Sequence, residues 1–286
     1  MSEDKENTCG VKGSLPLKWH GGKQYLADKI ITMMPEHIHY VEPYFGGGAV
    51  LFRKPCEGVS EVVNDLNGEL MNFWSILKID TNFKSFQRII ETTPFSEDTF
   101  SVVKHSVEDR RLSQNYLNDL DRAYQFFVKY RMSRQGLGKE FATLTRNRTR
   151  RGMNEQVSAW LSAVEGLPEC HERLKRVVIL NKNALDVIKQ QDGPNTLFYC
   201  DPPYLHETRT AKGTYGEYEM SKKDHWHLIT LLSTVRGKFL LSGYHSELYD
   251  SYAAQEGWTC KEFSLPNNAS GAKKKRRMVE CVWKNY

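Results

Sequence analysis

The 286-residue sequence has no apolar run long enough to cross a bilayer, which takes roughly 20 residues. Its first 16 residues are polar and lack the apolar centre of a signal peptide, so we expect a cytoplasmic protein. The six cysteines are widely spaced, which argues against a zinc ribbon, a redox dithiol and a disulfide-bonded secreted scaffold. Repeats and low-complexity tracts are also absent, so a repeat architecture is not expected.

The composition and the charge distribution indicate a globular, nucleic-acid-binding protein. Apolar residues make up 40% of the chain and aromatic residues 12%, enough for a sizeable core. Residues 131–151 carry a formal charge of +6 and the run KKKRR (273–277) carries +5, whereas the net charge is only +5. The other 260 residues therefore carry −6. Two basic segments on an acidic body are typical of a nucleic-acid-binding surface, although a solvated basic loop has the same composition.

The spacing of apolar residues predicts an α/β fold built on a mainly parallel sheet. Between residues 38 and 77 we expect a strand in IHYVEP, a glycine loop entering a helix in FGGGAVLF, a strand in EVVND and a second helix. Such alternation implies parallel strands joined by right-handed crossovers. The last two strands, in WTCKEFSL and RMVECVWKN, predict an antiparallel hairpin that closes the sheet.

Strand patterns are missing from residues 80–174, where three segments have helical spacing instead. We therefore predict a sheet domain formed by residues 15–79 and 175–286, a helical insertion at 80–174 and a flexible N-terminus at 1–14.

A glycine loop and a carboxylate mark the first candidate site. Gly46, Gly47 and Gly48 follow a predicted strand that ends at Glu42, and glycines at such a turn let a ligand approach the backbone. The loop has neither the GxGxxG of a dinucleotide site nor the Lys-Ser/Thr of a phosphate loop. Asp65 ends the next strand, where a carboxylate can accept both hydroxyls of a ribose. An ordinary strand–helix crossover would carry the same residues.

The four residues Asp201, Pro202, Pro203 and Tyr204 form a sharper motif, directly after the apolar strand TLFYC. Consecutive prolines lack N–H donors, so a carbonyl of this segment can point outward. The carboxylate and that carbonyl can accept the two hydrogens of an exocyclic amine, while the tyrosine stacks on a planar base. The alternative is a simple turn after a strand.

Together these motifs resemble the Dam-type, alpha-group DNA adenine-N6 methyltransferases, which use S-adenosylmethionine. LKWHGGK (17–23), VEPYFGGGAV, VNDLN, DPPY and ECVWKNY occur in the family's order over essentially the whole chain. His20 stands where other members often have a small residue. The resemblance implies a Rossmann-like methyltransferase fold in which the helical insertion is the target-recognition domain.

The resemblance also implies which residues form the site. The cofactor-binding residues would be Trp19, Gly21, Gly22, Lys23, Glu42, Phe45, Gly46, Gly47, Gly48, Asp65, Asp186 and Asp201. The catalytic residues that receive the target adenine would be Asp201, Pro202, Pro203 and Tyr204. The two basic segments supply the predicted DNA contacts, which are Arg131, Arg134, Arg146, Arg148, Arg150, Arg151, Lys273, Lys274 and Lys275.

We therefore expect a site-specific enzyme that methylates N6 of a flipped-out adenine in double-stranded DNA, without a metal ion. We expect no membrane partner, a monomer or weak dimer, a bacterial or phage source and, in a restriction–modification system, a cognate restriction endonuclease. Cytosine-N4 methylation, methylation of a protein glutamine and a non-catalytic DNA-binding role are the alternatives. Asp201 before Pro-Pro-Tyr, where cytosine-N4 enzymes favour serine and glutamine enzymes asparagine, favours adenine. The basic insertion disfavours a protein substrate.

Overall fold

The computed structural model describes the chain except residues 1–9, 114–116, 143, 210–212, 214 and 267–276. The chain divides into two compact units. The first comprises Met1–Met33, Gly46–Gly58 and Asn67–Asn181, and the second comprises Met34–Phe45, Val59–Leu66 and Lys182–Tyr286. The domain boundaries predicted from the sequence placed the LKWHGGK motif and the glycine loop in the sheet domain. The division by packing instead groups both segments with the helices of the first unit.

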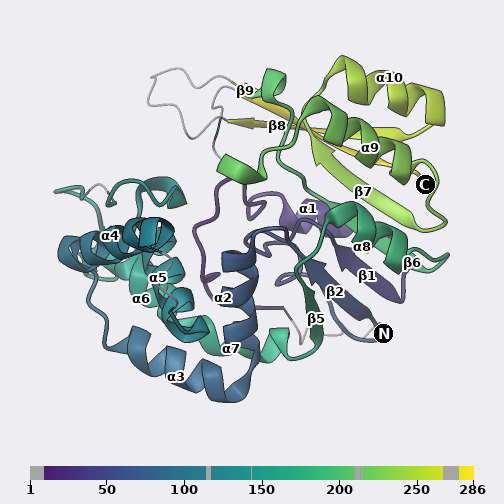
Figure 1. The fold of residues 1–286 in the computed structure, drawn as a ribbon. Helices are drawn as coiled ribbons and strands as arrows, with labels where there is room; N and C mark the ends of the chain where they lie inside the picture. Colours follow the sequence, from purple (N-terminus) through teal and green to yellow (C-terminus); the bar gives the residue numbers. More distant parts are fainter. Residues whose placement is uncertain (1–9, 114–116, 143, 210–212, 214, 267–276) are drawn as a thin grey trace, which may run out of the picture. The chain divides into compact units, whose positions relative to one another are not determined.

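The second unit contains six strands of a seven-stranded sheet, in the order β2-β1-β6-β7-β9-β8 (Figure 1). These strands are β1 (His39–Glu42), β2 (Ser60–Asn64), β6 (Thr196–Cys200), β7 (Lys238–Gly243), β8 (Thr259–Pro266) and β9 (Arg277–Lys284). The seventh strand, β5 (Val177–Leu180), belongs to the chain segment of the first unit. Neighbouring strands from β2 to β7 are parallel, whereas β9 is antiparallel to both β7 and β8. The predicted α/β fold with a terminal antiparallel hairpin is confirmed.

The central strands of this sheet are continuous apolar runs because both of their faces are covered. Val41, Phe198 and Leu240 are completely buried, as expected for parallel strands flanked by helices. The helices of this unit are α8 (Ala184–Gln191), α9 (Lys222–Leu232) and α10 (Glu247–Glu256). Helix α9 begins at a capping box formed by Ser221 and Asp224, which satisfies free N–H groups at its first turn.

The first unit is mainly helical, which confirms the helical character predicted for the insertion. Its helices are α1 (Ala27–Thr32), α2 (Gly68–Lys78), α3 (Asp80–Glu91), α4 (Glu97–Ser113), α5 (Asp119–Arg131), α6 (Glu155–Glu165) and α7 (Leu167–Leu174). Aromatic side chains form its core, where Phe73 stacks on Phe127 with ring centroids 5.8 Å apart and both are completely buried. Trp74 and Phe86 are also fully buried beside Phe73.

The helix predicted in FGGGAVLF is wrong. Residues 44–58 form successive turns, such as those closed by the bonds Phe52 N–H to Gly48 O (3.1 Å) and Arg53 N–H to Val50 O (3.1 Å). Gly46 and Gly48 have positive φ angles of 50° and 68°, and a right-handed helix does not tolerate this conformation.

A short hairpin in the basic segment was not predicted. It pairs β3 (Thr149–Arg150) with antiparallel β4 (Met153–Asn154). The two residues between the strands, Arg151 and Gly152, have φ angles of 56° and 74°. Two positive φ angles in succession are typical of the tight turn that suits the twist of a hairpin.

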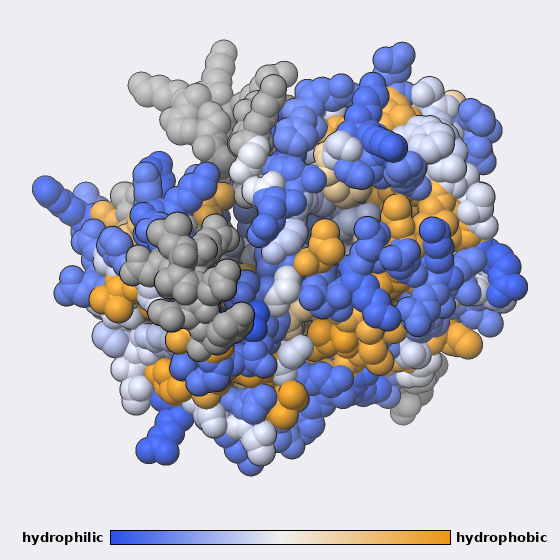
Figure 2. Space-filling model, viewed as in Figure 1, coloured by the Kyte–Doolittle hydropathy of each residue, from blue (hydrophilic) through white to orange (hydrophobic). Residues whose placement is uncertain are grey.

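Across the residues that the structure describes, no helix has the length and apolar character needed to span a membrane. The visible face of the molecule is mainly hydrophilic, and its apolar side chains lie in separate patches (Figure 2).

Candidate active site

The acidic candidates of the second unit lie at one edge of its sheet. Glu42 ends β1, Asp65 directly follows β2, and Asp201 directly follows β6. The register pairs Glu42 with Val63 and Val41 with Phe198, so the three parallel strands end at similar heights. The carboxyl ends of parallel strands are where α/β sheets bind ligands. The fold therefore brings together Glu42, Asp65 and Asp201 although they are up to 159 residues apart.

Asn64, which we did not predict, positions the loops around this edge. Its side chain is completely buried and donates to the carbonyls of Pro43 and Lys182, both at 3.0 Å. Its Oδ1 accepts the Lys182 N–H at 2.8 Å, and its carbonyl accepts the Phe45 N–H at 2.8 Å. One side chain thus fixes the segments that follow β1 and precede α8. The sequence did contain a signal for this role, because Asn64 is a polar residue at the end of the apolar strand β2, and a buried polar side chain needs hydrogen-bond partners.

The other predicted cofactor residues of this unit differ in burial. Glu42 is only 2% exposed and accepts a hydrogen bond from the hydroxyl of Tyr40 at 2.7 Å. Asp65 is half-buried, so its carboxylate reaches the surface. Asp186 lies exposed in the first turn of α8, and its predicted contact with the cofactor's adenine stays a prediction.

The turn after β6 holds the tyrosine of the DPPY motif rigidly. The Tyr204 hydroxyl donates to Oε1 of Glu280 at 2.5 Å, and its ring packs edge-on against Tyr244 at 4.9 Å. Glu280 is 2% exposed and lies on β9. Burial, Asp201 and Glu280 together raise the pKa of Tyr204 well above its usual value, so the phenol stays protonated as a donor. The sequence did not reveal Tyr244 or Glu280 as partners.

His225 of α9 supports the same turn from the interior. Its side chain is completely buried, and Nδ1 lies 2.8 Å from the hydroxyl of Tyr249. The imidazole also faces the backbone of Pro203. Burial lowers the pKa of His225 to about 4, so the ring is neutral at physiological pH.

The cofactor candidates of the first unit come together around Trp19. A Cβ atom added at Gly46 would lie 2.7 Å from Trp19 Nε1, and one added at Gly47 would lie 2.7 Å from Trp19 Cβ. Glycine is therefore required at both positions because the indole packs directly on the loop. Nζ of Lys23, which is 5% exposed, donates to the carbonyl of Gly21 at 2.8 Å and closes the LKWHGGK turn.

This motif also packs on the helices of the insertion. The Trp19 ring lies 5.4 Å from that of Tyr130 and 6.1 Å from that of Phe126, both on α5. Gly136 lies against the backbone of Lys18, the residue before Trp19. A Cβ atom added at Gly136 would lie 1.9 Å from the carbonyl oxygen of Lys18. Nζ of Lys18 donates to Oε1 of Gln156 at 3.0 Å. Burial lowers the pKa of the Lys18 amine to about 8.

The predicted DNA-binding arginines fall into three groups. Arg131 is 6% exposed and donates to the carbonyl of Ala159, so it is part of the interior. Arg134, Arg148 and Arg151 are exposed and lie near the acids Glu140, Glu155 and Glu165 at 3.7, 3.9 and 2.8 Å. Arg146 and Arg150 are exposed and form no ion pair with any described residue. Lys273, Lys274 and Lys275 lie outside the described residues.

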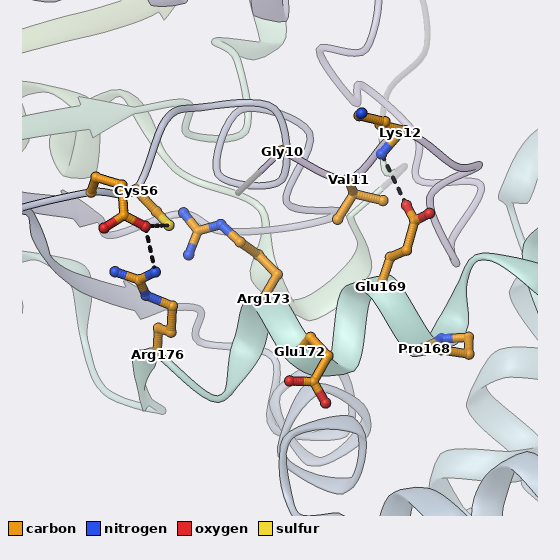
Figure 3. A pocket seen from close by; sticks show the side chains of 10 residues that line it. Gly10, Val11, Lys12, Cys56, Pro168, Glu169, Glu172, Arg173 and Arg176 are labelled. Carbon is orange, nitrogen blue, oxygen red and sulfur yellow. Dashed lines mark hydrogen bonds and ion pairs between the residues drawn. The ribbon is translucent and has the colours of Figure 1, made fainter. Parts of the chain in front are cut away.

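A pocket of about 540 Å³ in the first unit contains none of the predicted site residues (Figure 3). Its polar side chains already bind neighbours, since Oε2 of Glu169 accepts the backbone N–H of Lys12 at 2.9 Å. Arg176 likewise pairs with Glu57 at 2.8 Å. We therefore assign this pocket to the packing of α7 against the N-terminal segment.

Comparison with known proteins identifies relatives along most of the chain. The sequence model described as D12 class N6 adenine-specific DNA methyltransferase matches residues 19–263. The type II methyltransferase M.MjaIII of Methanocaldococcus jannaschii is 25% identical over 94% of this chain and 98% of its own. The DNA adenine methylase of Serratia marcescens is 25% identical over 81% of this chain and 84% of its own. The DNA adenine methylase of Vibrio cholerae is 26% identical over 69% and 68%, respectively.

Proposed function

The chain belongs to the D12 class of N6 adenine-specific DNA methyltransferases, and we propose that it methylates a flipped-out adenine at a specific site in double-stranded DNA. The observation that carries this proposal is the position of Asp201, Pro202, Pro203 and Tyr204 at the carboxyl edge of β6, in line with Glu42 and Asp65. The recognition sequence is a property of the helical insertion at residues 80–174, which we propose as the target-recognition domain.

The chemistry of this edge fits S-adenosylmethionine. The cofactor supplies a methyl group on a positively charged sulfonium, and it also carries an ammonium group and ribose hydroxyls. Three carboxylates at one edge, Glu42, Asp65 and Asp201, match these positive and hydroxyl groups. Asp65 would accept the ribose hydroxyls because its half-buried carboxylate reaches the surface. Further residues proposed to hold the cofactor are Trp19, Gly21, Gly22, Lys23, Phe45, Gly46, Gly47, Gly48 and Asp186.

The DPPY turn positions the amine to be methylated. Asp201 and a proline-segment carbonyl accept the two N6 hydrogens, which favours localisation of the nitrogen lone pair and stabilises positive charge that develops on nitrogen. Tyr204 would stack on the adenine, and its bond to Glu280 fixes the ring before the base arrives. The proton lost from N6 passes to Asp201 or to solvent.

The exposed arginines are proposed to bind DNA. Arg146 and Arg150 are the strongest candidates because they lie on or beside the β3–β4 hairpin and no described acid neutralises them. Arg134, Arg148 and Arg151 would exchange their acidic partners for phosphates, and ion pairs in which the arginine is exposed cost little to break. The buried Arg131 is assigned a structural role instead. Lys273, Lys274 and Lys275 remain proposed phosphate contacts.

We further propose that the enzyme acts in the cytoplasm as a monomer or weak dimer. The names of its type II relatives suggest a cognate restriction endonuclease as a partner.

Methyl transfer to DNA with labelled S-adenosylmethionine, followed by nucleoside analysis, tests the proposed function. We expect N6-methyladenine from the native chain and none from Asp201→Ala, while cofactor binding is largely retained because Glu42 and Asp65 are unchanged. Glu256→Ala, which removes an exposed carboxylate at the end of α10, is the matched control and should remain active. N4-methylcytosine, a labelled protein or the absence of transfer would each contradict the proposal.

A further inference from the structure

The side chains of His245, Cys260 and Cys281 lie close together at the C-terminal hairpin. All three residues follow the DPPY motif by more than 40 positions in the sequence. One ligand atom from each of His245, Cys260 and Cys281 lies within 4.8 Å of the others. His245 lies between β7 and α10, Cys260 on β8 and Cys281 on β9. Both cysteines are free thiols, and their side chains are hydrogen-bonded to each other. None of the three residues belongs to the site described above.

The strand register directs a fourth candidate ligand to the same face. Glu262 lies directly opposite Cys281 in the antiparallel pair β8–β9. Cys260 lies two residues before Glu262, so these three side chains share one face of the hairpin. Oε1 of Glu262 lies 3.2 Å from Nε2 of His245, and Oδ1 of Asp250 lies 2.8 Å from Nδ1. The imidazole is thus held between a carboxylate on the hairpin and one on α10.

We propose that His245, Cys260, Cys281 and Glu262 bind one zinc ion. Thiolate and imidazole ligands select Zn²⁺ over Mg²⁺ or Ca²⁺, and a single carboxylate can complete a tetrahedral set. Nε2 is the ligand atom because it faces Glu262, whereas Asp250 retains Nδ1 and orients the ring. Binding releases the two thiol protons to solvent, because the cysteines coordinate as thiolates.

The site is close to the geometry that zinc needs. In a tetrahedral site with bonds of about 2.0–2.3 Å, ligand atoms are about 3.3–3.8 Å apart. The ligand atoms of His245, Cys260 and Cys281 lie within 4.8 Å of one another, so these three must contract by about 1 Å, and Glu262, now 3.2 Å from Nε2 of His245, must turn toward the same point; side-chain rotation supplies both movements. Cys281 is completely buried, whereas Cys260 is exposed, so metal and chelators can enter from the side of β8.

Four protein ligands leave no open position, so the zinc would be structural. It would join the start of α10 to both strands of the hairpin. Cys281 directly follows Glu280, whose side chain on the opposite face of β9 holds Tyr204. The ion would therefore stiffen the strand that positions the base-stacking tyrosine, without taking part in methyl transfer.

Titration with Co²⁺ tests this proposal, because tetrahedral thiolate coordination gives Co²⁺ intense visible bands and a thiolate-to-metal band in the near ultraviolet. The full chain, reduced and freed of metal by a chelator, should bind one equivalent of Co²⁺ with these bands and release it on addition of Zn²⁺. Zn²⁺ should also raise the temperature of unfolding. A colourless titration, or a Co²⁺ spectrum of purely octahedral type, would overturn the proposal.

Three variants assign the ligands. Cys260→Ser removes an exposed ligand that the fold does not need, so it should fold and lose both the thiolate band and the Zn²⁺-induced shift. Glu262→Gln should weaken Co²⁺ affinity at least tenfold while keeping the thiolate band. Cys170→Ala, in α7, is the matched control and should bind like the native chain. Equal binding by the native chain and Cys260→Ser would refute the site, whatever the methylation assay shows.

Discussion

Replacing Gly136 by alanine should destabilise the protein in two ways. It should add the strain of a positive φ angle, and it should push the new side chain against the LKWHGGK motif. Gly136 has a φ of 68°, a conformation that costs an L-residue about 1–2 kcal/mol. The new Cβ would also lie 1.9 Å from the carbonyl oxygen of Lys18, whereas real contacts stay above 3.0 Å. Because that oxygen belongs to the backbone, the segment before Trp19 must move by about 1 Å, and overpacking of this kind costs about 1–3 kcal/mol.

Gly152→Ala provides the matched control for this experiment. Gly152 has nearly the same φ, 74°, but nothing lies within 4 Å of the added Cβ. In urea unfolding we expect a loss of about 1–2 kcal/mol for Gly152→Ala and about 2–5 kcal/mol for Gly136→Ala. Only Gly136→Ala should also weaken S-adenosylmethionine binding in calorimetry, since it displaces Trp19. Equal losses of stability in the two variants would show that the close approach to Lys18 has no energetic consequence.

Four further substitutions test other parts of the molecule. Asp65→Ala should weaken S-adenosylmethionine binding by about 1.5–3 kcal/mol, and unchanged calorimetric affinity would move the ribose site elsewhere. Arg150→Ala should reduce the steepness of the plot of log DNA affinity against log salt concentration by about one unit of slope. An unchanged slope would show that Arg150 does not contact a phosphate. Tyr204→Phe should destabilise the fold by about 1.5–3 kcal/mol through loss of the bond to buried Glu280, with Tyr252→Phe, half-buried on α10, as the less affected control. The pKa of His225 is about 4 in the native state against 6.5 ordinarily, so below pH 6.5 the unfolded chain takes up a proton that the native state does not. Native stability should therefore fall by about 3 kcal/mol between pH 6.5 and 4, and His225→Gln should lack this part of the pH dependence.

The fold class and the acidic edge were predictable from the sequence because both depend on short-range patterns. Short apolar runs predicted the strands that became β1, β2 and β6, and their parallel order brings their carboxyl ends to one edge. The motifs that end these strands therefore predicted which carboxylates would meet.

The sequence was misleading where glycine was involved. FGGGAVLF has apolar spacing typical of a helix, but positive φ angles at Gly46 and Gly48 produce turns instead. The reason for glycine at positions 46 and 47 is the indole of Trp19, which lies 27 residues earlier in the chain. No local pattern records such a contact.

Only the tertiary structure decided how each side chain is used. Arg131 and Arg150 belong to the same basic segment, yet burial against Ala159 makes Arg131 structural while the hairpin leaves Arg150 exposed. Glu280 and Cys281 are adjacent, but the alternation of the strand directs one to Tyr204 and the other to His245 and Cys260. Composition and spacing determine which residues are available. Burial and strand register, which depend on segments far apart in the chain, determine what those residues contact.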